Sequence, residues 1–187
     1  MTNYHIDQAG FADNAQFIAS PNFDERPTEI DSGKRTEIKL IVIHNISLPP
    51  GQYGGNGIIA LFTNQLDPNE HPYYAQIHGY KVSAHFLIRR NGSLLQFVSC
   101  LNRAWHAGQS NWQGRERCND FSVGIEIEGS DFDVFEPAQY LTLNTLLADL
   151  IKKYPIKAIV GHSDIAPVRK TDPGPYFDWS QVKTLST

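Results

Sequence analysis

The chain has 187 residues, of which 41% are hydrophobic and 19% charged, a composition that suits a globular protein with its own buried core. Sixteen Lys and Arg residues against twenty Asp and Glu give a formal charge of -4, which leaves no broad positive surface for a nucleic acid or an anionic membrane. The two cysteines lack CxxC spacing, which excludes a disulfide framework and a thiolate zinc knuckle.

The opening segment of the chain is polar. Its first basic residue is Arg26, and no apolar block of the kind found in secretory signals accompanies a basic start. No apolar run approaches the roughly 20 residues of a membrane-spanning helix. We therefore expect a cytoplasmic protein without a membrane partner. No repeat or long linker interrupts the chain, which predicts one domain over residues 1–187, with residues 1–20 as its N-terminal extension.

The first predicted elements are a strand and a short helix. Residues 38–44, IKLIVIH, form a β-branched apolar run that is typical of a central strand buried on both faces, and His44 ends it. The segment LPPGQYGG then breaks regular structure. Apolar residues recur at helical spacing over 58–66, which predicts an amphipathic helix with Asn56 as a possible cap. Residues 68–80 have the composition of a loop.

A hairpin and a further strand come next. Residues 84–89 and 94–98 are rich in β-forming side chains and flank an Asn-Gly pair, the strongest short hairpin signal, which predicts an antiparallel pair. Residues 123–128, VGIEIE, alternate strictly between apolar and other side chains. Glu126 and Glu128 are therefore expected on the same face of that strand.

The last third of the chain predicts a helix, a strand and a loop. Pro137 begins a long helix with one apolar stripe, and Pro155 ends it. Residues 157–160 predict a short strand. The remainder, from Gly161, is rich in Pro, Gly and charge and predicts an ordered functional loop. Because strands and helices interleave around one hairpin, we predict an α/β fold, a single domain with a mixed central β-sheet flanked by α-helices.

Two histidines follow buried strands at comparable places. His44 follows IVI and His162 follows IVG, and each alone is more typical of a satisfied core or hinge residue than of a metal ligand. Asp172 comes ten residues after His162, where a Pro-Gly pair would turn the chain and hold the carboxylate inward. Two imidazole nitrogens and one carboxylate oxygen match a catalytic zinc site with an open fourth position. The pattern predicts one Zn²⁺ per chain, bound by His44, His162 and Asp172.

Long motifs in fixed order then resemble one family. They include VIHNISLPPGQYGG (42–55), RAWHAG (103–108), GRERCNDFSVGIEIEG (114–129) and GHSDIAPVRKTDPGPYFDW (161–179). These segments are similar to those of the cytoplasmic 1,6-anhydro-N-acetylmuramyl-L-alanine amidases of peptidoglycan recycling. The resemblance covers roughly residues 20–182. It implies the fold that this family shares with phage amidases and peptidoglycan-recognition proteins.

The resemblance implies a reaction and roles for named residues. The expected reaction is hydrolysis of the amide between the lactyl group of 1,6-anhydro-N-acetylmuramic acid and L-alanine of the stem peptide. The expected partner is therefore a small anhydromuropeptide, and we expect a monomer. Zinc ligation carries over to the trio already singled out. Glu126 is expected to act as the acid-base carboxylate, and Lys170 to stabilise the oxyanion.

Four substrate contacts also follow from the resemblance. Trp105 matches a residue beside the anhydro-sugar, and Asn45 is expected to hydrogen-bond the sugar or the peptide. Arg117 matches the arginine that receives the diaminopimelate carboxylate, and Ala166 matches a backbone contact in the same pocket. Lys81 stands where the family commonly has arginine, so it offers a point charge in place of a planar fork.

Three alternatives are weighed against this interpretation. A non-catalytic peptidoglycan-recognition module would be expected to lack a zinc ligand, and none is missing here. A structural zinc protein would want a fourth protein ligand, and no cysteine stands beside His44 or His162. A secreted or phage-type zinc amidase acting on intact cell-wall peptidoglycan shares fold and chemistry. The match through RAWHAG and GRERCND favours the anhydro-specific enzymes over it.

Overall fold

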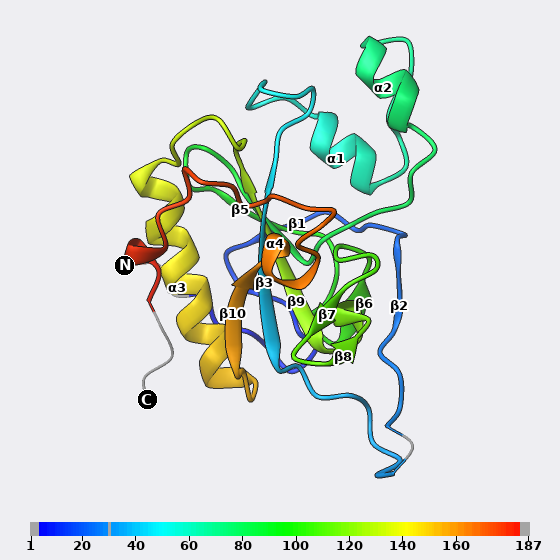
Figure 1. Cartoon of the computed structure of the whole chain (residues 1–187), viewed down its shortest axis with the longest axis vertical. Helices are drawn as coiled ribbons and strands as arrows, with labels where there is room; N and C mark the ends of the chain where they lie inside the picture. The colour runs from blue at the N-terminus through cyan, green and yellow to red at the C-terminus, as the bar shows by residue number, and fades with distance from the viewer. Residues whose placement is uncertain (1–3, 30, 184–187) are drawn as a thin grey trace.

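A six-stranded sheet organises the computed structural model, which describes residues 4–29 and 31–183 (Figure 1). Its strands, in the order β1-β5-β4-β9-β3-β10, are β1 (Gln16–Phe17), β5 (Leu94–Gln96), β4 (Phe86–Ile88), β9 (Ser122–Glu128), β3 (Leu40–Ile46) and β10 (Ala158–Gly161). The pair β4–β5 is antiparallel, and the other pairs of this sheet are parallel. The predicted mixed central sheet is confirmed.

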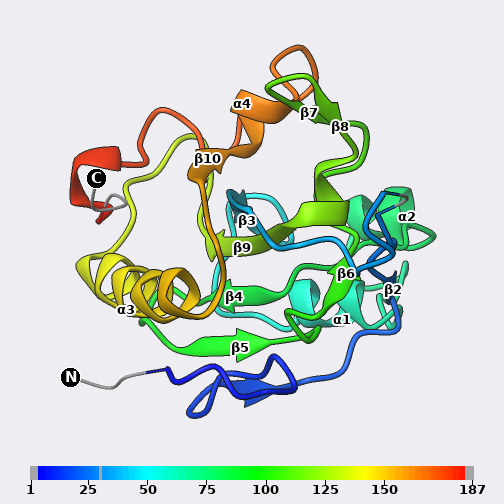
Figure 2. The same ribbon diagram turned by 90° about the horizontal axis from the view of Figure 1, so that it is seen from below.

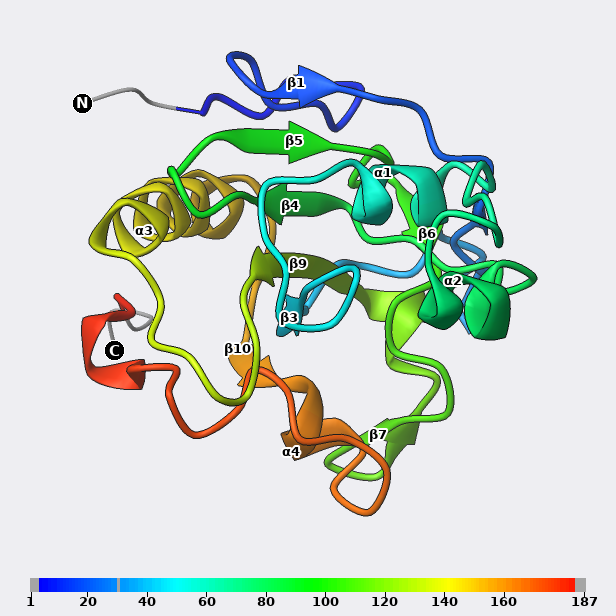
Figure 3. The same cartoon turned by 90° about the horizontal axis from the view of Figure 1, so that it is seen from above.

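Helices cover both faces of this sheet (Figures 2 and 3). The helices are α1 (Gly57–Phe62), α2 (Pro72–Ile77), α3 (Pro137–Lys153) and α4 (His162–Ile165), with 3-10 turns at η1 (Cys118–Phe121) and η2 (Trp179–Gln181). Two small antiparallel pairs complete the fold: β2 (Phe23–Glu25) with β6 (Asn102–Ala104), and β7 (Asn111–Trp112) with β8 (Arg115–Glu116). The flanked α/β architecture agrees with the prediction.

Alternation along the central strands decides which side chains reach the functional site. Ile41 and Ile43 of β3 pack with α3 in the main core, whereas Val42 belongs to a second cluster on the opposite face. In the parallel register of β3 with β9, His44 lies directly opposite Glu126. Both side chains therefore point away from the face that α3 covers.

Several predicted elements are found with shifted ends. The strand predicted over 38–44 is β3, two residues further along, and the hairpin is β4 with β5. The helix α3 begins at Pro137 as predicted, and the backbone N–H of Glu136 donates to the side chain of Gln139 in a capping box. Helix α1 ends earlier than predicted, and Asn56 caps it without a side-chain hydrogen bond.

Two predicted loops contain helices. The expectation for residues 68–80 was wrong, because Pro72–Ile77 form α2: Pro72 fits the first helical turn, and His71 Nδ1 accepts from the N–H of Tyr73 at 3.1 Å. This short helix has too few apolar residues on one face for a helical periodicity to be seen in the sequence. The loop expected from Gly161 begins with α4, which is only one turn long.

The N-terminal segment is part of the packed fold. Strand β1 extends the sheet beside β5, and Arg26, 3% exposed, donates to the backbone carbonyls of Cys100 and Ser122 at 3.0 and 2.7 Å. The predicted bounds of the domain fall at residues 1 and 187, outside the described residues, and stay a prediction. Within the described part of the chain, no helix is long and apolar enough to cross a membrane.

Candidate active site

Three neighbouring parallel strands bring the chemistry-bearing side chains to one edge of the sheet. His44 lies near the end of β3, Glu126 lies beside it on β9, and Gly161 of β10 pairs with Ile43. His162, the next residue, begins α4 and so enters the same row. The carboxyl ends of parallel strands commonly present functional groups in this way.

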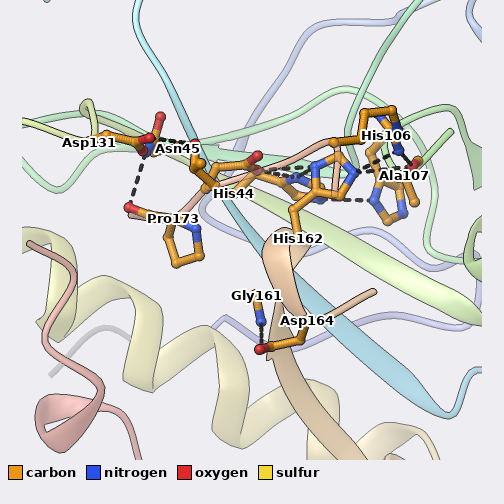
Figure 4. Close-up of polar contacts among 12 residues, drawn as sticks. His44, Asn45, His106, Ala107, Asp131, Gly161, His162, Asp164 and Pro173 are labelled. Carbon is orange, nitrogen blue, oxygen red and sulfur yellow. Dashed lines mark hydrogen bonds and ion pairs between the residues drawn. The ribbon is translucent and has the colours of Figure 1, made fainter. Parts of the chain in front are cut away.

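Donor atoms of three side chains converge on one point; Figure 4 shows the two histidines of this group. His44 Nδ1 lies 2.9 Å from His162 Nδ1, and Asp172 Oδ2 lies 3.0 and 3.1 Å from those two nitrogens. Zinc bonds of about 2.0–2.1 Å in tetrahedral geometry place ligand atoms roughly 3.3 Å apart. The spacing and the donor chemistry therefore fit a single divalent metal ion, with the predicted trio as its ligands.

The loop that carries Asp172 is held from two sides. The backbone N–H of Ser163 donates to the carbonyl of Asp172 at 2.9 Å, and the Asn45 amide donates to the carbonyl of Pro173 at 3.0 Å. The same Asn45 nitrogen donates to Asp131 at 2.6 Å. Both amide hydrogens of Asn45 therefore support the loop, so a contact with substrate would use its side-chain oxygen.

Burial and neighbouring charges set the protonation of these groups. Burial lowers the pKa of His44 to about 4, although the hydrogen bond that its ring donates to Asp172 acts in the opposite direction. Burial alone would raise the pKa of Asp172, but hydrogen bonds to His162 and His44 hold it well below its usual range. At neutral pH the pair therefore offers a neutral imidazole and a carboxylate, the forms that bind a metal.

Glu126 faces the same cavity in a different state. Burial raises the pKa of its carboxyl well above the usual range, and the carboxylate of Asp172 adds to the rise. Glu126 is 8% exposed, and its Oε2 has no hydrogen-bond partner within the described chain. By contrast, Glu128 accepts from the N–H groups of Gly54 and Arg90, which makes it a structural residue. A buried carboxyl with an open oxygen is suited to proton transfer.

A cavity of about 430 Å³ joins the donor trio and Glu126 to three other predicted residues, Asn45, Trp105 and Lys170. Apolar side chains of α1 and α2 form another part of its wall. Trp105 is held in place, because its Nε1–H donates to Asp24 Oδ1 at 3.2 Å. Trp105 thus lines the same cavity as the donor trio.

Arg117 and Ala166 line a second cavity of about 460 Å³, whose wall also includes residues 167–169. The Arg117 side chain is 68% exposed, and its Nε lies 3.2 Å from Asp120 Oδ2. The backbone N–H of Ala166 already donates to His162, and its carbonyl accepts from Arg169 and Lys170. Ala166 therefore presents its methyl group and backbone surface to this cavity, and no free backbone donor.

His106 is a site residue to which the sequence analysis gave no role. Its Nδ1 lies 3.0 Å from His44 Nε2, and its Nε2 lies 3.1 Å from Ser122 Oγ. The ring lines the first cavity. Its place in the RAWHAG motif, next to Trp105, was the available signal. Asp24, which holds Trp105, was also missed because strand β2 reaches β6 only through long-range pairing.

Comparisons with known proteins agree with this geometry. Residues 34–175 match the N-acetylmuramoyl-L-alanine amidase family. The chain belongs to this amidase family. The amidase is 51% identical over 180 residues to the 1,6-anhydro-N-acetylmuramyl-L-alanine amidase AmpD of Citrobacter freundii, which covers 95% of this chain and 93% of the relative.

Solved structures of two amidases are also similar to the structure of this chain. A crystal structure of a selenomethionine AmpD derivative superposes with a TM-score of 0.88 at 50% identity and covers 97% of both chains. The Escherichia coli amidase AmiD, solved with the substrate anhydro-N-acetylmuramic acid-L-Ala-D-γ-Glu-L-Lys, has a TM-score of 0.57 at 32% identity. The match covers 86% of this chain and 64% of AmiD.

Proposed function

We propose that this amidase uses one Zn²⁺ to hydrolyse the amide between the lactyl group of 1,6-anhydro-N-acetylmuramic acid and L-alanine. The observation that carries the proposal is the meeting, in one cavity, of three convergent metal donors with a buried carboxyl whose Oε2 lacks a partner in the described chain. The AmpD relatives, named for this anhydro substrate, support the choice of bond.

His44, His162 and Asp172 would hold the zinc ion, with the fourth tetrahedral position open. When bound there, zinc supplies Lewis acidity, which makes water a better nucleophile and a carbonyl a better electrophile. The neutral state of His44 and the ionised state of Asp172 leave their donor atoms free for this purpose at neutral pH.

Glu126 would move the proton. Its carboxylate takes a proton from the attacking water and returns it to the departing amine of L-alanine as the C–N bond breaks. The products are the free carboxylic acid of the sugar's lactyl group and a free peptide amine. The raised pKa of Glu126 suits this task, because such a carboxylate accepts a proton more readily near neutral pH. Lys170, on the same cavity wall, would stabilise the negative charge that develops on the carbonyl oxygen.

Two cavities would divide the recognition of the substrate. Trp105 offers a flat apolar surface to the sugar in the first cavity, and the side-chain oxygen of Asn45 can accept a hydrogen bond there. Arg117, exposed in the second cavity, would pair with the diaminopimelate carboxylate, and Ala166 would lie against the peptide. We further propose that a monomer carries out this reaction in cytoplasmic peptidoglycan recycling.

The test is product identification on a panel of substrates. Zinc-loaded protein is incubated with an anhydromuropeptide, the same muropeptide with a reducing sugar, and intact peptidoglycan, and the products are identified by mass spectrometry. We expect the anhydro-sugar and the free peptide from the first substrate at the highest rate. Faster release from intact wall would instead establish the wall-degrading alternative. The Glu126→Gln protein is the control for contaminating amidases.

A further inference from the structure

His44 directs its two ring nitrogens to different partners. Its Nδ1 faces His162 and Asp172, and its Nε2 lies 3.0 Å from Nδ1 of His106 (Figure 4). A neutral imidazole has one donor and one acceptor nitrogen. If the Nδ1 lone pair of His44 is free for a metal, its proton is on Nε2, and His106 Nδ1 has to accept it.

Ser122 completes this arrangement from the other side of the His106 ring. Because His106 Nδ1 accepts, its own proton is on Nε2, which lies 3.1 Å from the hydroxyl of the fully buried Ser122. Both nitrogens of His106 are thus engaged within the protein. His106 lines the cavity but has no nitrogen left to bind the metal or to exchange a proton with the substrate.

Gly124 provides the space for the His106 ring. A Cβ atom at Gly124 would lie 2.4 to 2.7 Å from three atoms of that ring, closer than Cβ atoms approach other groups. Gly124 lies two residues before Glu126 on β9, on the same face of the strand. A side chain at this position would push the ring out of its place beside His44.

The second metal-site histidine has a different outer partner. His162 Nε2 lies 3.1 Å from the backbone carbonyl of Ala107, the residue after His106. A carbonyl only accepts, so this contact places the proton of His162 on Nε2. The guanidinium of Arg169 donates to the same carbonyl at 2.8 Å. An imidazole partner can be donor or acceptor, so His106 must also be held in one orientation. Ser122 contacts its Nε2, and Gly124 leaves space for its ring.

We propose that His106 is a positioning residue, which accepts the Nε2 proton of His44 and thereby holds the Nδ1 lone pair of His44 on the metal. Outer partners of this kind commonly change metal affinity by about 10 to 100 fold. The inference rests on the metal-binding part of the proposed function.

The experiment compares zinc affinity among four variants and the wild type by competition with a chelator. His106→Phe keeps a ring but has no acceptor, whereas His106→Asn places an amide oxygen close to the position of Nδ1. Gly124→Ala displaces the ring without changing it. Gly79→Ala, at an exposed glycine with open space around it, is the matched control. The visible spectrum of the Co²⁺-substituted proteins and the thermal unfolding of the metal-free proteins are measured in parallel.

We expect zinc affinity to fall about 10 to 100 fold in His106→Phe and Gly124→Ala, with an altered Co²⁺ spectrum. His106→Asn should recover most of the affinity, and Gly79→Ala should match the wild type. Wild-type affinity and spectrum in His106→Phe would overturn the inference and leave the proposed function standing. So would a loss that His106→Asn fails to recover and that follows a fall in metal-free stability, because this would mean a merely structural role. A wild-type protein that does not bind zinc would refute the proposed function itself.

Discussion

The two cavities of this amidase are built in opposite ways. In the first, His44 and His162 are 2% exposed and stand at or just after the ends of paired parallel strands, so their positions are set by the sheet. In the second, the Arg117 side chain is 68% exposed. The backbone of Arg117 has a left-handed conformation, with φ of 60°, just before η1. The contrast teaches that the sheet places His44, Glu126 and His162, whereas Arg117, like Asp172, lies on a connecting segment.

The largest effect is expected from removal of a strand-end ligand. His162→Ala should lose zinc and lower turnover by about 10³-fold or more, since the lost Lewis-acid stabilisation amounts to several kcal/mol. Metal content by atomic emission and amidase rate check this. His5→Ala, at an exposed histidine, is the control and should keep both. Full zinc occupancy in His162→Ala would show that the first cavity does not bind metal through this residue.

The next effect separates proton transfer from metal binding in the same cavity. Glu126→Gln should keep its zinc and lose about 10²- to 10⁴-fold in turnover, because an amide cannot accept the proton. Zinc content and steady-state rates are measured on one preparation. A rate close to that of the wild type would move the acid-base role to another residue.

A smaller and selective effect is expected in the second cavity. Arg117→Ala should reduce cleavage of a diaminopimelate-containing anhydromuropeptide by about 10 to 100 fold, the loss of one charge-assisted pair. Zinc content should not change. A substrate that ends before diaminopimelate lacks the partner carboxylate, so both proteins should cleave it at similar rates. Equal losses of cleavage rate on the two substrates would mean that Arg117 supports the fold and does not bind the diaminopimelate carboxylate.

The last prediction concerns the stability of the protein and tests the burial of the Glu126 carboxyl in the first cavity. Folding raises the pKa of Glu126 above its ordinary value of 4.5, so the folded state binds that proton more tightly than the unfolded state does. The resulting stabilisation is full below pH 4.5 and is lost as pH rises through the folded-state pKa. In metal-free protein, the free energy of unfolding of Glu126→Gln should therefore rise relative to that of the wild type, by up to about 1.4 kcal/mol per pH unit in that window.

Denaturant unfolding between pH 4 and pH 8 measures this difference. Glu116→Gln, at an exposed carboxyl of the second cavity, is the matched control and should stay within about 0.5 kcal/mol of the wild type throughout. A pH-independent difference for Glu126→Gln would mean that its carboxyl is not buried as described.

Periodicity made the scaffold of the first cavity predictable. The apolar run before His44 and the alternation around Glu126 are strong strand signals, and the prolines at 137 and 155 bracket α3. The shared position of two histidines after strands was enough to predict that they meet. Strands of two or three residues, such as β1 and β2, carry no periodicity, and they form through pairing with distant segments.

Contacts between distant side chains could not be predicted in the same way. Nothing in the sequence links Asp24 to Trp105, since that hydrogen bond depends on the pairing of β2 with β6. The engagement of Asn45 with Asp131 and Pro173 depends on how two loops pack. A motif resemblance identifies functional residues, but it does not show which of their polar atoms already form hydrogen bonds within the protein.

The separation of the candidate donors along the chain has a consequence for when the proposed zinc ion would bind. His44 and His162 are 118 residues apart and meet only when β10 docks on β3. In an unfolded or partly synthesised chain, an ion that joined them would have to close that long loop at a large entropic cost. Metal uptake should therefore follow folding, and once bound the ion stabilises the native state by mass action.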